Sequence, residues 1–399
     1  MLKTLKEIRH CAHDDGPGKT RPRCILCGKC LEVCPLYAAT GQEELSPKAK
    51  FFLAQSMEGK APELTEKIAV ELAGKCLSCG KCEKACPFGL CVPELLSDMK
   101  AAHPGIESKL WKTWVEKARV LWPFMSTLSR FSPRFGIRRL DDMMGDLRAM
   151  GAGPRMDPWL RAAGWDACGR GRKALLFPGC VASHVRRHWT DASRRLLEGL
   201  GFEVLPDAGF QCCGCTLGHA GLKDVQREMQ LANLNAWRDA GRPELASFCA
   251  TCRCGLRSYA SRELGWQPGE EEQWLKGLVP FADFARHVRF EILANAPARV
   301  HYHTPCHGAG GGQDLEFLRS VLGGRLAART RKNLCCGFGG SLKLSAPELS
   351  SAVAKRCIDF YGPRPGEQIL TGCSGCVIQL RANAPEGVGV GHWLEVIDF

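Results

Sequence analysis

Long hydrophobic segments are missing from this sequence. No run of about 18 apolar residues occurs, so we expect no membrane-spanning helix. Residues 1–7 do not contain the apolar core of a secretory signal peptide. We therefore expect a cytoplasmic protein, either free or peripheral on the cytoplasmic face of the membrane.

Nucleotide-binding motifs are also missing. The sequence has no Walker loop, and the glycine-rich run at residues 308–312 lacks the G-x-G-x-x-G spacing that precedes a helix in dinucleotide-binding folds. We therefore expect that this chain binds neither flavin nor nicotinamide itself, and we assign no catalytic residue to it.

Cysteine, in contrast, is abundant. The 399 residues include 24 cysteines, and a chain of this length is expected to form two or three domains. Without a secretory signal, so many cysteines argue against a disulfide scaffold and in favour of metal ligands.

Eight of these cysteines form two identical runs near the N-terminus. Each run has the spacing C-x2-C-x2-C-x3-C-P, which is the ligand spacing of a [4Fe–4S] ferredoxin site. In two-cluster proteins the fourth cysteine of each run serves the other cluster. We therefore predict two [4Fe–4S] clusters, the first held by Cys24, Cys27, Cys30 and Cys86 and the second by Cys76, Cys79, Cys82 and Cys34. Gly28 and Gly80 would let the backbone approach each cluster.

Ten further cysteines belong to an internal repeat over residues 173–399. In each copy a short β-like run ends in a cysteine, a helical stretch follows, and a Cys-Cys-Gly and a C-x2-C complete the copy. The first copy contains Cys180, Cys212, Cys213, Cys249 and Cys252, and the second contains Cys306, Cys335, Cys336, Cys373 and Cys376.

Five thiols in each copy exceed the four irons of a cubane cluster. This surplus favours an unusual cluster or a spare reactive thiol. We predict one or two further iron–sulfur clusters in the repeats, of cubane or noncubane type, with each set of five cysteines as the candidate ligands. Buried inert cysteines are the alternative.

The expected fold class is α+β with several domains. Residues 1–105 are predicted to form an α-helical ferredoxin-like domain, with Ser46 and Pro47 starting a helix and a second helix over 62–72. Residues 106–172 are a connector, rich in Trp, Arg and Pro, that forms either a membrane-surface helix or a helix packed on a neighbouring domain or subunit. Residues 173–296 and 297–399 are two repeated α/β cysteine-rich domains.

The remaining cysteines are expected to be ordinary thiols. They are Cys11, Cys91, Cys168, Cys215, Cys254 and Cys357, of which Cys215 and Cys254 adjoin predicted ligands and are possible alternates. His301, His303 and His307 flank Cys306, where structural roles are the more common outcome. The net charge of +12 suits an acidic partner or anionic lipid, and part of it offsets the negative charge of the clusters, so we expect no nucleic-acid partner.

With these motifs in place, the chain resembles the iron–sulfur subunit of glycolate oxidase and D-lactate dehydrogenases. It is also similar to the C subunit of anaerobic glycerol-3-phosphate dehydrogenase and to the D subunit of heterodisulfide reductase. The resemblance is carried by both ferredoxin runs, by both Cys-Cys-Gly copies, and by CGKCLEVCPLY at 27–37, SPKAK at 46–50, LCCG at 334–337 and HWLE at 392–395.

The resemblance implies an electron-transfer subunit. A separate FAD-containing subunit would oxidise a 2-hydroxy acid such as glycolate or D-lactate, and this chain would pass the electrons to a quinone or another acceptor. Both C-x2-C pairs are complete here, whereas chains of the glycolate oxidase type can lack some of these cysteines. That departure favours the heterodisulfide reductase pattern, which implies disulfide reduction at a noncubane cluster as the alternative function.

Overall fold

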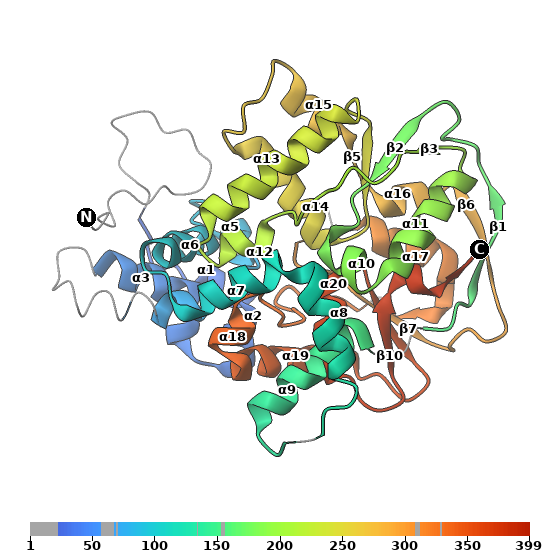
Figure 1. The fold of residues 1–399 in the computed structure, drawn as a ribbon. Helices are drawn as coiled ribbons and strands as arrows, with labels where there is room; N and C mark the ends of the chain where they lie inside the picture. The colour runs from blue at the N-terminus through green and yellow to red at the C-terminus, as the bar shows by residue number, and fades with distance from the viewer. Residues whose placement is uncertain are drawn as a thin grey trace. The chain divides into compact units, whose positions relative to one another are not determined.

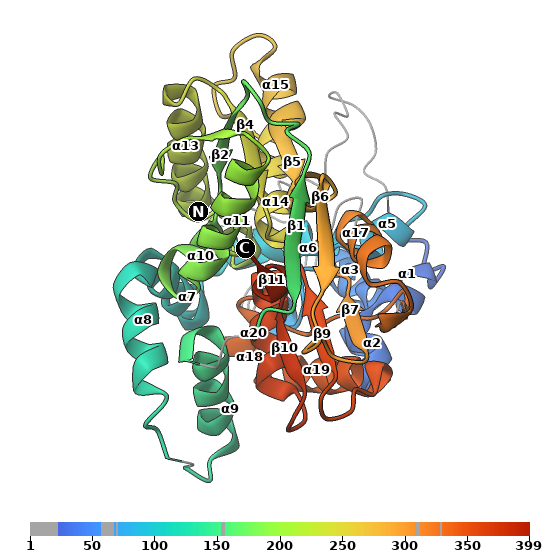
Figure 2. The ribbon, with the colours of Figure 1, turned by 90° about the vertical axis from the view of Figure 1, so that its right-hand side faces the viewer.

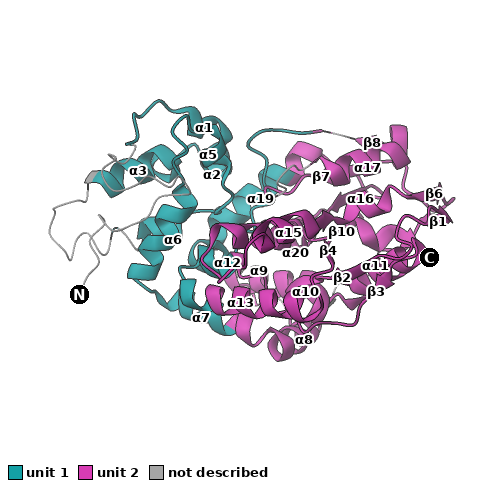
Figure 3. Ribbon diagram, turned by 90° about the horizontal axis from the view of Figure 1, so that it is seen from above, with its two compact units in different colours: residues 1–113, 216–225, 330–357 teal, residues 114–215, 226–329, 358–399 magenta. Residues whose placement is uncertain are grey.

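The computed structural model describes residues 23–56, 68, 71–133, 135–152, 156–307, 312–327 and 329–399. The chain divides into two compact units, each made of three separate segments (Figure 3). Unit 1 comprises residues 1–113, 216–225 and 330–357, and unit 2 comprises residues 114–215, 226–329 and 358–399. The expected Cys11, most of the expected helix at 62–72 and most of the glycine run at 308–312 lie outside the described residues.

Unit 1 is helical throughout its described N-terminal part. Its elements there are α1 (Lys29–Val33), α2 (Pro35–Thr40), the short 3-10 helix η2 (Glu43–Leu45), α3 (Pro47–Ser56), α5 (Lys81–Ala85), α6 (Val92–Ala102) and α7 (Ile106–Glu116), whose end passes into unit 2 (Figure 1). The Ser46 hydroxyl accepts a hydrogen bond from the Ala49 amide at 3.2 Å, and Pro47 is the first residue of α3. The expected helix start is thus confirmed.

The apolar core of unit 1 lies between α3 and α6. Phe51 from α3 packs with Leu95, Leu96 and Met99 from α6, and the cysteines of both ferredoxin runs border this cluster. Complete burial of such a side chain stabilises the fold by about 1.5–3 kcal/mol. The core therefore holds the two cysteine runs in fixed positions.

Two later segments complete unit 1. They contain α12 (Cys215–His219), the first turn of α13 (Lys223–Asp239), α18 (Leu342–Ser345) and most of α19 (Pro347–Tyr361). The Ser97 hydroxyl of α6 donates to the Gly218 carbonyl at 2.5 Å, and the Ser345 hydroxyl donates to the Gly74 carbonyl at 2.8 Å. Each copy of the repeat thus contributes one segment that is hydrogen-bonded to the ferredoxin-like region.

Unit 2 contains two parallel sheets of the same topology. The first has the order β3-β2-β4-β5, formed by β2 (Lys173–Leu176), β3 (Glu203–Val204), β4 (Glu244–Ser247) and β5 (Leu278–Pro280). The second has the order β10-β9-β7-β8, formed by β7 (Val300–His303), β8 (Leu326–Ala327), β9 (Gln368–Thr371) and β10 (Gly389–His392). Written from its other edge, the second sheet has the order β8-β7-β9-β10, so each of its strands occupies the same place as its counterpart in the first sheet. The expected α/β repeat is thus confirmed.

Helices connect the strands in matching places. The first copy uses α10 (Gly179–His184), α11 (Arg187–Gly199), α13, α14 (Ala250–Arg257), the 3-10 helix η4 (Ser258–Ser261), α15 (Glu270–Gly277) and α16 (Phe281–Ala285). The second uses α17 (Gln313–Leu322), the 3-10 helix η5 (Gly323–Arg325), α19, α20 (Ser374–Asn383) and the 3-10 helix η6 (Trp393–Val396). In both copies a C-x2-C begins where a central strand ends and a helix starts.

A third sheet joins the two copies within unit 2. The strand β1 (Leu160–Trp165) pairs antiparallel with β6 (Val288–Ile292) and parallel with β11 (Ile397–Asp398) (Figure 2). β6 and β11 follow the last parallel strand of the first and second copies, respectively. The predicted connector therefore contributes a strand that the sequence pattern did not indicate.

The rest of the connector is helical. Besides α7 it forms α8 (Ala118–Leu128), α9 (Arg138–Leu147) and a short π-helical turn, η3 (Arg148–Ala152). Buried Arg186 donates from Nε to the Met150 carbonyl and from Nη2 to the Ala149 carbonyl, both at 2.9 Å. Among the described residues no helix is both long and apolar enough to cross a membrane.

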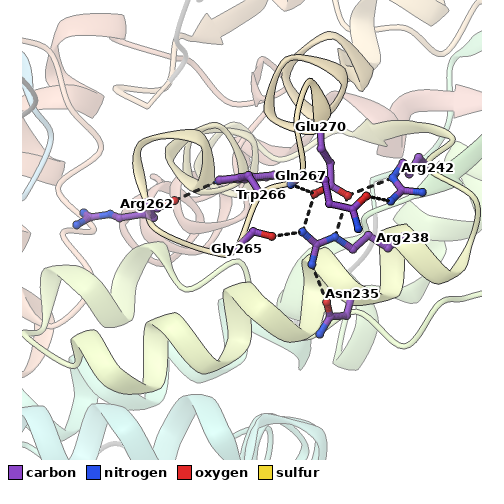
Figure 4. Close-up of polar contacts among 8 residues, drawn as sticks. All are labelled: Asn235, Arg238, Arg242, Arg262, Gly265, Trp266, Gln267 and Glu270. Carbon is purple, nitrogen blue, oxygen red and sulfur yellow. Dashed lines mark hydrogen bonds and ion pairs between the residues drawn. The ribbon is translucent and has the colours of Figure 1, made fainter.

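A buried carboxylate organises the outer part of the first cysteine-rich copy. Glu270, at the start of α15, accepts hydrogen bonds from Arg238 Nε at 2.8 Å and Nη2 at 2.6 Å, from Arg242 Nε at 3.1 Å and from the Gln267 amide at 3.0 Å (Figure 4). The Arg238 hydrogen bonds lower the pKa of Glu270 to about 2 although burial opposes the shift. The carboxylate therefore stays ionised and ties α13 to α15.

Glu270→Gln should lower the free energy of local opening of α13 and α15 by about 2 kcal/mol, because two guanidinium groups lose their buried carboxylate. Hydrogen exchange of these helices, followed by mass spectrometry, measures the loss. The folded-state pKa lies below the ordinary value, so the stabilisation is complete above about pH 4.5 and is lost only as the pH falls toward 2. The difference between variant and parent should therefore be the same at pH 6 and pH 8, whereas a difference that changes across this range would contradict the assignment. Glu272→Gln, in the exposed ion pair with Lys276, is the control and should change little.

Candidate metal centres

The first group of cysteines surrounds a hollow of about 420 Å³ in unit 1. The side chains that line it include Cys24, Cys27, Cys30 and Cys86, together with Cys82 and the apolar Phe51, Phe88, Leu90 and Val92. Cys30 lies in α1, while Cys86 follows the last residue of α5. The four cysteines predicted to hold the first cluster thus face one space.

The second group surrounds a neighbouring hollow of about 360 Å³ in unit 1. Its lining includes Cys34, Cys76, Cys79 and Cys82, with Lys50 and Lys81 among the other side chains. Cys34 comes from the first run and lies here, and Cys86 comes from the second run and lies in the first hollow. This is the crossed arrangement that the sequence predicts, and four thiols in a mostly apolar setting are a donor set that suits a [4Fe–4S] cluster. Ligation by these residues stays a prediction.

The two runs share an unusual backbone conformation. Gly28 and Gly80 have φ of +80° and +66° and directly precede α1 and α5. Two positions earlier, Leu26 and Ser78 also have positive φ, at 58° and 50°. Non-glycine residues rarely adopt this region, and such strain gathers at functional sites. The sequence indicated the glycines, but nothing in it identified Leu26 and Ser78.

Lysine side chains compensate the buried thiols of the second site. Burial raises the pKa of Cys79 and Cys82, so the thiolate form that metals bind needs positive charge nearby. Lys50 is 2% exposed, and this burial lowers the pKa of its ammonium group. The nearby sulfurs of Cys76, Cys34 and Cys82 act in the opposite direction and favour the charged form. The second site therefore includes a buried ammonium group that sequence reasoning did not assign to it.

In unit 2 the five cysteines of the first copy converge. Thiol–thiol hydrogen bonds link Cys180 to Cys212, Cys212 to Cys213, Cys213 to Cys252 and Cys252 to Cys249. Cys180 follows β2 and Cys249 follows β4, so both lie at the carboxyl ends of parallel strands, where α/β sheets bind ligands. The structure therefore brings together all five residues that the sequence selected, and their ligation of a cluster stays a prediction.

Two glycines, Gly179 and Gly255, lie so close to these sulfurs that a larger residue would collide with them. A Cβ added to Gly179 would lie 2.6 Å from the Cys252 sulfur, and one added to Gly255 would lie 3.0 Å from the Cys213 sulfur. Gly179 has φ of +73°, which other residues adopt only with strain. The backbone is thus fitted closely around the thiol group, which suits a bound cluster.

The cysteines of the second copy are divided between the units. Cys306, Cys373 and Cys376 belong to unit 2, and Cys335 and Cys336 belong to unit 1. Within unit 2, the Cys373 thiol is hydrogen-bonded to Cys249 of the first copy and to Cys376. The Thr251 hydroxyl lies 3.2 Å from the Cys373 sulfur, and the Ser374 amide donates to the Cys249 sulfur at 3.5 Å. The C-x2-C pairs of the two copies are therefore in direct contact, which the sequence did not predict.

Within unit 1, the Cys335-Cys336 loop lies beside the second ferredoxin site. Burial is the largest cause of the raised pKa of Cys79, and the neighbouring Cys335 sulfur is the next largest. Lys81, between Cys79 and Cys82, donates from Nζ to the carbonyls of Lys332 at 2.8 Å and Leu334 at 2.9 Å. This lysine therefore holds the residue before Cys335 against the second ferredoxin run.

The other candidate residues have mainly structural surroundings. Cys215 and Cys254 are hydrogen-bonded to each other, and Cys91 and Cys357 are buried while Cys168 is half-buried. His301 Nε2 lies 2.9 Å from Glu367, His303 Nδ1 lies 3.3 Å from the Tyr361 hydroxyl, and His307 Nδ1 lies 3.2 Å from the Thr251 hydroxyl. His303 places a ring nitrogen within 4.8 Å of the sulfur of Cys376, a predicted ligand, and His307 contacts Thr251, whose hydroxyl lies 3.2 Å from the Cys373 sulfur.

Comparisons with known proteins agree with these two kinds of centre. Residues 22–90 match the family model of the 4Fe-4S dicluster domain, and residues 174–257 and 300–381 each match that of the cysteine-rich domain. The glycolate oxidase iron-sulfur subunit of Escherichia coli is 26% identical over 94% of this chain and 93% of its own. The B subunit of the fumarate reductase (CoM/CoB) of Methanothermobacter marburgensis is 24% identical over 94% of this chain and 71% of its own.

A third relative represents the alternative considered above. The D subunit of the dihydromethanophenazine:CoB–CoM heterodisulfide reductase of Methanosarcina mazei is 25% identical over 83% of this chain and 81% of its own. These relatives and the matched domains support iron–sulfur clusters and an electron-transfer role. The chain therefore joins a 4Fe-4S dicluster domain to two cysteine-rich domains, and over most of its length it is similar to the glycolate oxidase iron–sulfur subunit and to heterodisulfide reductase D subunits.

Proposed function

We propose that this chain is the electron-transfer subunit of a flavin-linked 2-hydroxyacid dehydrogenase complex. An FAD-containing partner oxidises glycolate or D-lactate, and this chain passes the electrons to a quinone or another acceptor. The relatives from Escherichia coli and Bacillus subtilis named as glycolate oxidase iron-sulfur subunits support this proposal. Iron–sulfur clusters supply one-electron transfer, and the protein supplies their spacing and surroundings.

One observation carries the proposal. Within unit 1 the second ferredoxin site and the Cys335-Cys336 loop adjoin through Cys79, Cys335 and the two hydrogen bonds of Lys81. A dicluster domain that adjoins the cysteines of a second kind of centre provides a route for electrons out of the dicluster domain. The ligand sets in this proposal are the two crossed sets of four and the two sets of five cysteines given above.

A surface of α8 supports the need for a partner protein. Val120, Phe124 and Leu128 are 70%, 62% and 52% exposed, and their spacing of four residues places them on one face of the helix. Contiguous exposed apolar groups mark interaction sites, and the exposed Glu116, Lys117 and Arg119 beside them give this face charges of both signs. We assign this face to the FAD-containing subunit and place the complex in the cytoplasm or at the cytoplasmic face of the membrane.

Disulfide reduction is the second candidate function. The contact between Cys249 and Cys373 favours it, because the C-x2-C pairs of both copies then border one region of unit 2. Complete cysteine sets in both copies and the heterodisulfide reductase relatives point the same way. In this case the chain itself would carry the substrate site, with a noncubane cluster as its cofactor.

The isolated chain should not oxidise glycolate or D-lactate, because it has no flavin-binding motif. Addition of an FAD-containing 2-hydroxyacid dehydrogenase subunit that co-purifies with the chain should give electron flow from the hydroxy acid to a quinone analogue. Stopped-flow reduction of the chain's visible absorbance measures the step. Turnover of either hydroxy acid by the chain alone would contradict the subunit assignment, and rapid oxidation of the reduced chain by a heterodisulfide would favour the second candidate.

The crossed ligand sets lead to a specific mutational outcome. Cys86→Ser should disturb the same cluster as Cys27→Ser, although Cys86 belongs to the run of Cys79. Cys79→Ser and Cys34→Ser should form the second matching pair. EPR spectra and iron content of the anaerobically purified variants measure the effect.

The buried Cys91, which precedes α6 and is not a predicted ligand, provides the matched control, and Cys91→Ser should retain both clusters. If the spectrum of Cys86→Ser matched that of Cys79→Ser instead, the ligand sets would follow the sequence runs and the crossed assignment would be wrong.

A further inference from the structure

The two ferredoxin sites differ in the charge that surrounds them. Lys50 of α3 lines the second hollow, is 2% exposed, and donates from Nζ to the Leu45 carbonyl. Its charged-group neighbours are the sulfurs of Cys76, Cys34 and Cys82, followed by the Lys75 ammonium, which forms an ion pair with Glu71. The charge of the Lys50 ammonium therefore acts on the second site in a setting from which water is excluded, where electrostatic interactions are strongest.

Two lysines, Lys29 and Lys48, line the first hollow, but neither is buried, and Lys29 is exposed to solvent. Lys48, two residues earlier in α3, lines the first hollow. Its ammonium forms an ion pair with Glu43, and its side chain is 25% exposed. The carboxylate and the solvent offset the positive charge before it reaches the first site.

Further lysines increase this difference. Lys100 of α6 is half-buried, has the Cys76 sulfur and then Glu107 as charged neighbours, and donates to the His219 carbonyl and the Ser341 hydroxyl at 3.3 Å. Lys81 lines the second hollow and holds the Cys335 loop. The second site thus combines the stronger positive field with the position next to the following cysteines.

We propose that Lys50 sets the reduction potential of the second ferredoxin site above that of the first, so that electrons collect at the site beside Cys335. This inference rests on the electron-transfer role proposed above. A cluster gains negative charge when it takes up an electron, and a buried positive charge stabilises that state. With a cluster bound at each site, one electron would pass from the reduced first site to the oxidised second site, and no bond or proton would need to change.

The test is a redox titration of the full-length chain, purified anaerobically and monitored by EPR. The signal lost in Cys79→Ser identifies the second site. Lys50→Met and Lys50→Gln should shift the potential of that signal to more negative values and move the other signal less. Lys50→Arg, which keeps the charge, should retain the parent potential. Lys48→Met is the matched control on the same helix and should leave the second site unchanged.

Iron and acid-labile sulfide are counted in each variant, so that a lost cluster is distinguished from a shifted potential. Lys50→Gln keeps a donor for the Leu45 carbonyl and serves if Lys50→Met fails to fold. The inference is overturned if neither neutral variant shifts the second site, if the first site shifts more, or if Lys50→Arg shifts the potential as far as Lys50→Gln. The titration uses dithionite as reductant and needs no partner. Failure of glycolate or D-lactate to reduce the chain in the presence of an FAD-containing partner would therefore reject the proposed function and leave this inference intact.

Discussion

The burial of closely spaced thiols is the constraint on which the rest of the structure depends. In unit 2, seven sulfurs from Cys180 to Cys376 form one hydrogen-bonded chain. A buried thiol resists ionisation, whereas metal–sulfur ligation needs the thiolate, so the site needs positive charge from the metal and from the protein. α14 and α20 begin directly after Cys249 and Cys373, and helix N-termini favour negative charge. In unit 1 the buried Lys50 and the half-buried Lys81 and Lys100 supply positive charge beside the second ferredoxin site.

The repeated topology explains how so many cysteines reach common places. Parallel strands with helical connections put all strand carboxyl ends at one edge of a sheet. Cys180 and Cys249 lie at that edge in the first copy, and Cys306 and Cys373 lie at it in the second. Each copy also gives one segment to unit 1, at residues 216–225 and 330–357. The fold therefore connects the cysteine-rich copies to the ferredoxin sites through the backbone itself.

Local patterns predicted the parts of this structure that depend on local sequence. The ferredoxin spacing indicated the crossed groups of four cysteines, Ser46-Pro47 indicated the start of α3, and the β-like runs at Leu176 and His303 indicated the central strands. Contacts between distant segments could not be predicted, because no sequence pattern indicates that Cys249 lies beside Cys373 or that Cys79 lies beside Cys335. The burial of Lys50 and the positive φ of Leu26 and Ser78 are likewise set by tertiary packing rather than by residue type.

The central claim is that unit 1 holds two iron–sulfur clusters close enough to exchange electrons. The most direct measurement is the EPR spectrum of the anaerobically purified chain after full reduction, with iron and acid-labile sulfide counted on the same sample. The account predicts two [4Fe–4S] signals broadened by magnetic interaction with each other. A single unbroadened signal, or zinc without acid-labile sulfide, would contradict it.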